Sequence, residues 1–344
     1  MNGHAKRSRK RSLITGGAGF VGSHLAEVLL DRGDDVTVLD NLSTGSVDNI
    51  EHLQGDARFA FHVGDIRDRE LVDELVAGAD VVFHLGAAVG VKLILDDPIE
   101  SLHTNVFGTE TVVSAAAKYG KKVLLASTSE VYGKVAKIPQ HEDDDIILGP
   151  TSYSRWSYAA AKMLDEFIGL AHARRGVPVV CFRLFNTVGP RQTGAYGMVV
   201  PRFVSAAVHG RPVEVYGDGS QSRCFLHVED AVEAIVRLET NDRAIGEVFN
   251  IGSTESVTIL DLARRVLSEA GADRKLITFR PYAEAYPDGG FEEIQRRQPD
   301  ISKIRGVTRW HPKRRLDHII RDVIAEHAVV TAPGEVEMPV VAIA

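Results

Sequence analysis

Two side chains that can do acid–base chemistry together lie four positions apart in the middle of the chain. Tyr158 carries a phenol and Lys162 an amine, separated by three alanines. On a helix this spacing puts both groups on one face, where the positive amine lowers the pKa of the phenol. A free phenol titrates near 10, so moving it to about 7 takes roughly 4 kcal/mol. The pair predicts a general base for a hydroxyl substrate, although the same spacing also occurs by chance on helix surfaces.

A glycine-rich turn near the N-terminus has the spacing that holds the phosphates of a dinucleotide. Gly16, Gly19 and Gly22 follow a short apolar run and precede an amphipathic stretch. Such glycines permit a tight turn, close approach of a pyrophosphate and close helix packing. The amides at the start of the helix then face the phosphate charge. Phe20 and Val21 belong to the same predicted cofactor site.

A carboxylate at the end of the next apolar run selects the dinucleotide. Asp40 follows the glycine turn by about twenty positions. It would accept hydrogen bonds from a ribose diol and repel a 2′-phosphate, which favours NAD over NADP. Asn41, and Asp65 with Ile66 after the following strand, are predicted to lie near the adenosine. Small residues after His84 are predicted to let the cofactor lie against the backbone, and the cofactor contacts expected there are Leu85, Ala87 and Ala88.

The elements that position these groups alternate between apolar runs and amphipathic stretches. The predicted strands are Ser12–Thr15, Val36–Leu39, Arg58–His62, Val81–His84, Lys122–Ser127, Val179–Arg183 and Val248–Ile251. The predicted helices are Ser23–Asp31, Glu70–Val76, Asn105–Lys118, Tyr158–Arg175, Val228–Glu239 and Ile259–Ala270. Strands that are apolar throughout and separated by helices predict an α/β fold with a doubly wound parallel sheet, which binds ligands at the carboxyl ends of its strands.

The sequence pattern changes after about Asn186, where frequent glycines and prolines predict loops and short elements. We predict a dinucleotide-binding (Rossmann) domain made of residues 11–186 and about 225–252. A smaller, discontinuous α/β substrate domain is predicted for residues 187–224 and about 253–328. Residues 1–10, which are basic, and 331–344 are predicted to be tails.

Composition excludes several other classes. The chain has 344 residues, of which 25% are charged, and its formal net charge of -7 gives no reason to expect nucleic-acid binding. No stretch approaches the roughly 20 apolar residues that span a bilayer. Cys181 and Cys224 are the only cysteines and neither lies in a metal-binding pattern, so no metal site is predicted. Nothing argues for an oxidising compartment, and we expect the protein in the cytoplasm.

A series of motifs in a fixed order resembles the nucleotide-sugar-modifying branch of the extended short-chain dehydrogenase/reductase family. The matching segments are Gly16–Gly22, Asp40, His84–Ala88, Thr128–Gly133, Tyr158 with Lys162, Arg183–Asn186 and Val215–Gly219. The resemblance covers roughly residues 11–325. It implies a Rossmann domain, a small nucleotide-sugar domain, and NAD that is reduced and reoxidised within one cycle. It also implies a homodimer whose interface helices would be Asn105–Lys118 and Tyr158–Arg175.

Residues beside the base separate the reactions of this family. Members that eliminate water typically carry Asp-Glu where this chain has Ser129-Glu130, so a 4,6-dehydratase would lack its general acid here. Thr128-Ser129-Glu130 resembles the UDP-glucuronate decarboxylases, which also carry an arginine before a late proline. Arg297 is the counterpart in Gln295-Arg296-Arg297-Gln298-Pro299-Asp300. Gln298 departs from the lysine that those enzymes often have.

The resemblance implies an NAD-dependent UDP-glucuronate decarboxylase that acts through a 4′-ketone. Tyr158 would take the proton of the sugar 4′-hydroxyl, Thr128 would bond its oxygen, and Glu130 and Arg297 would handle the carboxylate and the C5′ proton. The implied nucleotide-sugar contacts are Asn186, Arg191, Arg202, Tyr216, Arg223 and Arg297. A nucleotide-sugar 4-epimerase is the main alternative, and a dinucleotide-sensing protein without turnover is a third.

Overall fold

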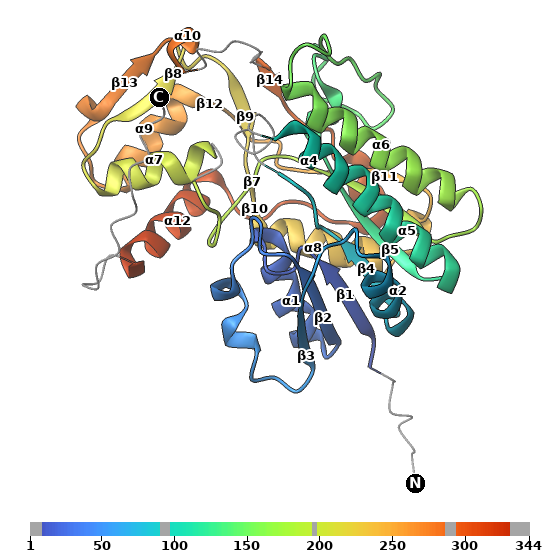
Figure 1. Cartoon of the computed structure of the whole chain (residues 1–344). Helices are drawn as coiled ribbons and strands as arrows, with labels where there is room; N and C mark the ends of the chain where they lie inside the picture. The colour runs from blue at the N-terminus through green and yellow to red at the C-terminus, as the bar shows by residue number, and fades with distance from the viewer. Residues whose placement is uncertain (1–8, 90–96, 195–197, 286–293, 331–344) are drawn as a thin grey trace.

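A seven-stranded parallel sheet forms the centre of the protein. In this computed structural model, which describes residues 9–89, 97–194, 198–285 and 294–330, its strand order is β11-β6-β5-β4-β1-β2-β3 (Figure 1). The strands are β1 (Arg11–Thr15), β2 (Asp35–Asp40), β3 (Phe59–Val63), β4 (Val81–His84), β5 (Lys122–Thr128), β6 (Val179–Leu184) and β11 (Val248–Ile251). The order reverses between β1 and β4, which are neighbours, and this is the doubly wound arrangement that the alternating pattern predicts.

Helices cover both faces of this sheet. Helices α1 (Phe20–Arg32) and α8 (Val228–Glu239) pack together on one face, and α2 (Arg69–Gly78), α5 (Gly108–Tyr119) and α6 (Arg155–Ala173) pack on the other. Adjacent β1 residues contribute to different cores, because successive strand side chains point to opposite faces. Leu13 packs under α2 and α5, and Ile14 packs under α1 and α8. The predicted fold class is confirmed.

The structure differs from the expected elements at three places. Strand β3 is apolar in sequence, yet most of its side chains are exposed or partly exposed because it is the edge strand. The helix expected over Asn105–Lys118 begins as a short helix α4 (Pro98–Leu102) and a π-helical turn, η3 (His103–Phe107), that leads into α5. Helix α6 begins at Arg155, three residues earlier than expected, and this adds an arginine to the turn before Tyr158.

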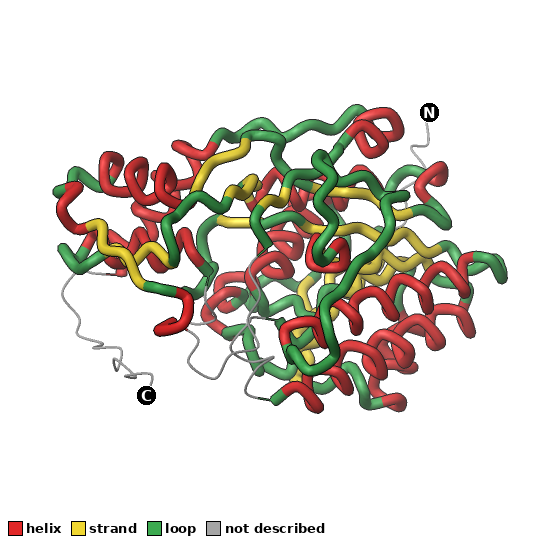
Figure 2. Tube along the Cα trace, turned by 90° about the horizontal axis from the view of Figure 1, so that it is seen from above, coloured by secondary structure: helices red, strands yellow, loops and turns green. Residues whose placement is uncertain are grey.

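A second group of elements lies to one side of the large sheet (Figures 1 and 2). Its helices are α7 (Val199–Val208), α9 (Ile259–Glu269), α10 (Tyr282–Ala285) and α12 (Leu316–Val330). The short helix α11 (Ser302–Thr308) lies against α8 and β11 of the large sheet. Its strands form pairs or triplets: β7 (Thr187–Val188) with β10 (Leu226–His227), β8 (Val213–Tyr216) with β13 (Ile277–Arg280), and β9 (Ser222–Cys224) between β12 (Ser256–Thr258) and β14 (Arg296–Arg297).

Helices α7, α9 and α12 share a core of their own with β8. Ile304 of α11 and the nearby Trp310 instead pack into the core under α1 and α8. The division into two discontinuous domains stays a prediction, and most of both predicted tails lies outside the described residues. Within the described ranges, no helix combines the length and apolar character needed to traverse a bilayer.

Candidate active site

The carboxyl ends of the parallel strands bring the sequence-predicted groups to one edge of the sheet. The glycine turn follows β1, Asp40 ends β2 and Thr128 ends β5. Thr128 also caps the short 3-10 helix η4 (Ser129–Tyr132), because its hydroxyl accepts a hydrogen bond from the Glu130 amide at 3.2 Å. Helix α6 packs beside η4 and carries Tyr158 and Lys162. The fold therefore explains why residues distant in sequence share one site.

The glycine turn is built so closely that side chains would not fit. A Cβ on Gly22 would lie 2.2 Å from the carbonyl oxygen of Gly16, and Gly16 itself has a φ of +71°. Helix α1 starts directly after this turn. Its N-cap residue, Gly19, has no side chain to bond the first amides, and its first turn contains no acidic residue. Its first amides are therefore available to an anion. These features fit the pyrophosphate of a dinucleotide.

Asp40 is buried beside the glycine turn, where the backbone amides of Ala18, Gly19 and Leu42 act on it as hydrogen-bond donors. The amide of Ala18 donates to Oδ2 at 3.0 Å, and the amide of Leu42 donates to Oδ1 at 2.8 Å. Burial raises the pKa of this carboxyl, and the backbone donors counteract only part of the effect. A carboxylate has about four lone-pair sites, so the group keeps acceptor capacity for a ribose hydroxyl.

Replacing Asp40 with serine is expected to weaken NAD binding by about ten- to a hundredfold, since a hydrogen bond to a charged group contributes roughly 1.5–3 kcal/mol. The preference for NAD over NADP should fall as well, because the repulsion of a 2′-phosphate disappears. Titration calorimetry with both dinucleotides measures this. Asp35→Asn, at the exposed opposite end of the same strand, is the matched control. An unchanged NAD affinity in Asp40→Ser would contradict the assignment.

The remaining predicted cofactor residues line the neighbouring strand ends. The amide of Ala88 donates to Asn105 at 2.8 Å, which ties the loop after β4 to the π-helical turn. Ile66 is buried against Gly108, where a Cβ would meet it at 2.4 Å. Asp65 is engaged by Arg67 in two hydrogen bonds, and these bonds hold the pKa of its carboxyl below the ordinary value. Asn41 also bonds this carboxyl, so the ends of β2 and β3 are brought together.

Tyr158 is half-buried, and the protein groups around it favour the neutral phenol. Burial raises its pKa, and the negative charges of Glu130 and Asp165 add to the effect. A hydrogen bond with Thr128 and the charge of Arg297 lower it only in part. The result differs from the expectation that Lys162 lowers this pKa, and the reason is visible in the structure. The Lys162 ammonium donates to Oδ2 of Asp165 at 2.7 Å, so a carboxylate offsets its charge.

Glu130 lies between two arginines. Arg297 contacts Oε1 at 2.7 Å and Arg155 contacts Oε2 at 3.4 Å, and both guanidinium groups are almost fully buried. Burial acts to raise the pKa of Glu130, but the charges of Arg297 and Arg155 hold it below its usual value. Arg297 also reaches the hydroxyl of Ser129 at 3.4 Å. Sequence reasoning missed Arg155, although its position three residues before Tyr158, one helical turn away, was the available signal.

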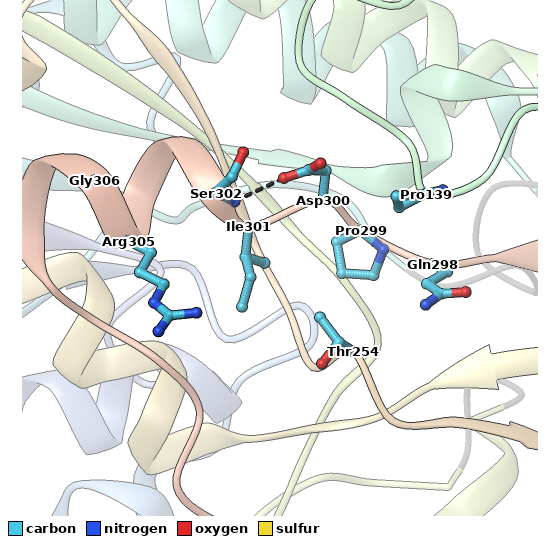
Figure 3. A pocket seen from close by; sticks show the side chains of 9 residues that line it. All are labelled: Pro139, Thr254, Gln298, Pro299, Asp300, Ile301, Ser302, Arg305 and Gly306. Carbon is cyan, nitrogen blue, oxygen red and sulfur yellow. Dashed lines mark hydrogen bonds between the residues drawn. The ribbon is translucent and has the colours of Figure 1, made fainter.

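A tightly bonded segment carries Arg297 into the site. Strand β14 pairs with β9 so that Arg297 lies opposite Arg223. Beyond it, Gln140 donates to the carbonyl of Gln298 and accepts from the amide of Asp300, both at 2.8 Å. A surface hollow of about 600 Å³ lies along this segment, where the Asp300 carboxylate accepts a hydrogen bond from the Ser302 amide at 2.7 Å (Figure 3). None of the predicted site residues lines that hollow.

The predicted nucleotide contacts fall into two groups. The guanidinium carbon of Arg202 lies 4.4 Å from the centre of the Tyr216 ring, and Nη1 of the same group donates to the Tyr216 hydroxyl at 2.6 Å. Asn186 donates to the carbonyl of Cys224 at 3.1 Å, which places it beside β9 and therefore near Arg223. Arg191 lies apart from these residues: its guanidinium contacts Ser23 and Glu27 of α1. Its predicted role in substrate binding stays a prediction.

Both cysteines lie in the interior of the protein. Cys181 and Cys224 are free and buried, and burial raises the pKa of Cys224 to about 12. Across the part of the chain that the structure describes, no group of three or more histidine, cysteine or carboxylate side chains is arranged to hold a metal ion.

This chain is similar in sequence to one protein family and to several named enzymes. The family described as GDP-mannose 4,6 dehydratase matches residues 13–323. A UDP-N-acetyl-alpha-D-glucosaminuronate decarboxylase of Bacillus cytotoxicus is 45% identical over 88% of this chain and 93% of its own length. UDP-glucuronic acid decarboxylase 1 of Danio rerio is 38% identical over 90% of this chain and 70% of its own length.

Among solved structures, DesIV, a dTDP-glucose 4,6-dehydratase from Streptomyces venezuelae, superimposes with a TM-score of 0.81. It is 30% identical and covers 91% of this chain and 95% of its own, and it was solved with NAD bound. The family match, the two relatives and the shared fold agree with the resemblance drawn from the sequence motifs. The chain belongs to the extended short-chain dehydrogenase/reductase family, in its nucleotide-sugar epimerase and dehydratase branch.

Proposed function

We propose that this protein is an NAD-dependent decarboxylase of a UDP-hexuronate that acts through a 4′-ketone. The observation that carries the proposal is the pair of buried arginines, Arg297 and Arg155, on either side of Glu130 and close to the base. The two relatives described above, both decarboxylases by name, support the same reaction over epimerisation.

The charges in the site favour a substrate that brings a carboxylate. Three arginines act on Glu130, because Arg223 also lowers its pKa together with Arg297 and Arg155. One carboxylate therefore faces several buried or partly buried guanidinium groups. Arginine binds carboxylates through paired, charge-assisted hydrogen bonds, so this cluster of guanidinium groups suits a sugar that carries a carboxylate.

The residues have distinct roles in this proposal. The glycine turn and Asp40 would hold NAD, which supplies a hydride acceptor and donor for C4′ when bound. Tyr158 takes the proton of the 4′-hydroxyl, and Thr128 bonds the same oxygen. The resulting ketone is β to the C5′ carboxylate, so CO2 leaves and the electrons of the broken bond remain as an enolate. Arg297 would bind the substrate carboxylate, Glu130 would hold Arg297 in place, and a proton from solvent water would then add to C5′.

The substrate is either UDP-glucuronate or its 2-acetamido form. UDP-glucuronate is the form implied by the Thr128-Ser129-Glu130 motif. The relative from Bacillus cytotoxicus, at 45% identity, is named for the 2-acetamido sugar and gives this second candidate specific support.

Incubation of the purified protein with each sugar nucleotide and NAD tests the proposal. We expect release of CO2 and a product lighter by the mass of CO2, which mass spectrometry detects. A product of unchanged mass would instead indicate the 4-epimerase. No product from either substrate, with folded protein that binds NAD, would remove both activities.

We also propose a homodimer formed through α5 and α6, which lie side by side on the outer face of the sheet (Figure 1). Helix α6 exposes 57% of Phe167, and the π-helical turn before α5 exposes 56% of Phe107. Exposed large apolar side chains on adjacent helices are typical of a subunit interface.

Light scattering is expected to give about twice the chain mass of 37.5 kDa. Phe167→Glu should shift it to the monomer mass, whereas Val208→Glu on the exposed surface of α7 should not. A wild-type protein that remains at the monomer mass would contradict the dimer.

A further inference from the structure

An ion pair inside α6 holds the lysine of the predicted base pair. The Lys162 ammonium donates to Oδ2 of Asp165 at 2.7 Å, and the two side chains are only 4% and 0% exposed. The other oxygen, Oδ1, is buried as well. A buried carboxylate in this position is costly unless something compensates it. The Lys162–Asp165 ion pair is therefore not an ordinary surface salt bridge, and its place beside Tyr158 suggests a role at the base.

A chain of buried hydrogen bonds continues from this carboxylate to the cofactor loop. Burial raises the pKa of the Asp165 carboxyl, and Lys162 and the hydroxyl donor Thr109 counteract part of this effect. His84 contacts Thr109 through Nε2 at 3.0 Å and Thr15 through Nδ1 at 2.7 Å. The Gly86 amide donates to the Thr15 hydroxyl at 3.2 Å.

The direction of this chain follows from chemistry. Burial lowers the pKa of His84 to about 3, so its imidazole is neutral and carries one proton. With Gly86 donating to Thr15, the threonine hydroxyl can donate to Nδ1, and Nε2–H can donate to Thr109. Thr109 then has its own hydroxyl proton for Asp165. The whole chain ends on the Asp165 carboxyl group, which accepts from Lys162 and can accept from Thr109.

We propose that Asp165 is a positioning residue of the base: it fixes the Lys162 ammonium on the buried side of α6 and offsets its positive charge at the Tyr158 phenol. The inference rests on the proposed role of Tyr158 as the base. It assigns to Asp165 the control of how readily that base ionises.

Several other charged or titratable groups face this region, and none reproduces the contact that Asp165 makes. Those acting on Tyr158 are Glu130 of η4 and Arg297 of β14, and those acting around Asp165 are Glu166 of α6, His84 of β4, and Cys181 and Arg183 of β6. Glu166 is held by Arg183 through two hydrogen bonds on the same buried face. It is a matched carboxylate that does not bond Lys162.

Asp165→Asn removes the charge and keeps an acceptor for Lys162. A phenol that loses a nearby negative charge ionises more readily, so its pKa should fall by about one unit. We would follow Tyr158 directly, by NMR of protein with ¹³C-labelled tyrosine, using Tyr158→Phe to assign its signal. The acid limb of the kcat/KM profile for UDP-glucuronate should move to lower pH by the same amount. Glu166→Gln, in contrast, is expected to lower Tm without moving the titration.

The outcomes separate this inference from the proposed function. A lower Tyr158 titration in Asp165→Asn supports the role of Asp165 even if no sugar nucleotide is decarboxylated, which would sink the proposed function alone. An unchanged titration in folded protein overturns the role of Asp165. Asp165→Ser, smaller and also neutral, serves if Asp165→Asn does not fold. Failure of both to fold overturns the inference too, since a purely structural ion pair would then account for the contact.

Discussion

Tyr158→Phe is expected to lower kcat for UDP-hexuronate decarboxylation by about a thousandfold, because general-base catalysis contributes on the order of 10²–10⁴. The substitution removes only the hydroxyl, so the ring that packs in the site is retained. NAD affinity should change little, since the glycine turn and Asp40 make no described contact through the phenol oxygen. The measurement is CO2 release under saturating substrate, paired with NAD titration.

Tyr153→Phe is the control, because Tyr153 is an exposed phenol just before the same helix. It should retain wild-type turnover. If Tyr158→Phe turned over at the wild-type rate, the phenol would not be the base. If the wild type bound NAD with no turnover at all, the reading as a dinucleotide sensor would gain support.

Arg297→Met is expected to lower kcat/KM by at least a hundredfold. Removing one partner of a buried ion pair costs about 3–5 kcal/mol, because the other charge is left uncompensated. Here Glu130 would keep the Arg155 contact at 3.4 Å and the charge of Arg223, and the substrate carboxylate would lose its proposed partner. Arg297→Lys should recover part of the activity, since it restores the charge without the planar geometry.

Arg296→Met is the matched control, because Arg296 is the exposed neighbour on the same strand.

The ion pair between Glu130 and Arg297 also predicts that stability depends on pH. Since the pKa of Glu130 is lowered in the folded protein, its contribution to stability is present at neutral pH and is lost as the pH falls through that lowered value. The difference in Tm between wild type and Arg297→Met should therefore shrink in acid. Equal activity of the Arg296 and Arg297 variants would refute the assignment.

Local pattern was enough to predict the large sheet and its helices. Strand β4 and helix α8 begin and end at the predicted residues, because apolar runs and helical spacing are properties of contiguous sequence. The glycine turn could likewise be predicted, since the spacing of Gly16, Gly19 and Gly22 is typical of a turn in which backbone segments lie too close together for side chains.

The charge environment of the site could not be predicted in the same way. Whether Lys162 lowers the pKa of Tyr158 depends on Asp165, whose side chain lies against the lysine only once α6 is packed on the sheet. The contact of Arg155 with Glu130 depends on where α6 begins and how it meets η4. Arg191 was predicted to bind substrate, but its guanidinium contacts Ser23 and Glu27 of α1. These contacts result from tertiary packing and cannot be inferred from the residues next to Arg191 in sequence.

The fate of a deuterium label at C4′ of UDP-glucuronate tests the central claim most directly. If Tyr158 initiates a transient oxidation at that carbon and the hydride returns within the same cycle, the UDP-pentose product should retain the deuterium at C4′ while CO2 is released. Mass spectrometry and NMR of the product read this out. A product that has lost CO2 but carries hydrogen at C4′, or a labelled substrate that is never decarboxylated, would contradict the mechanism.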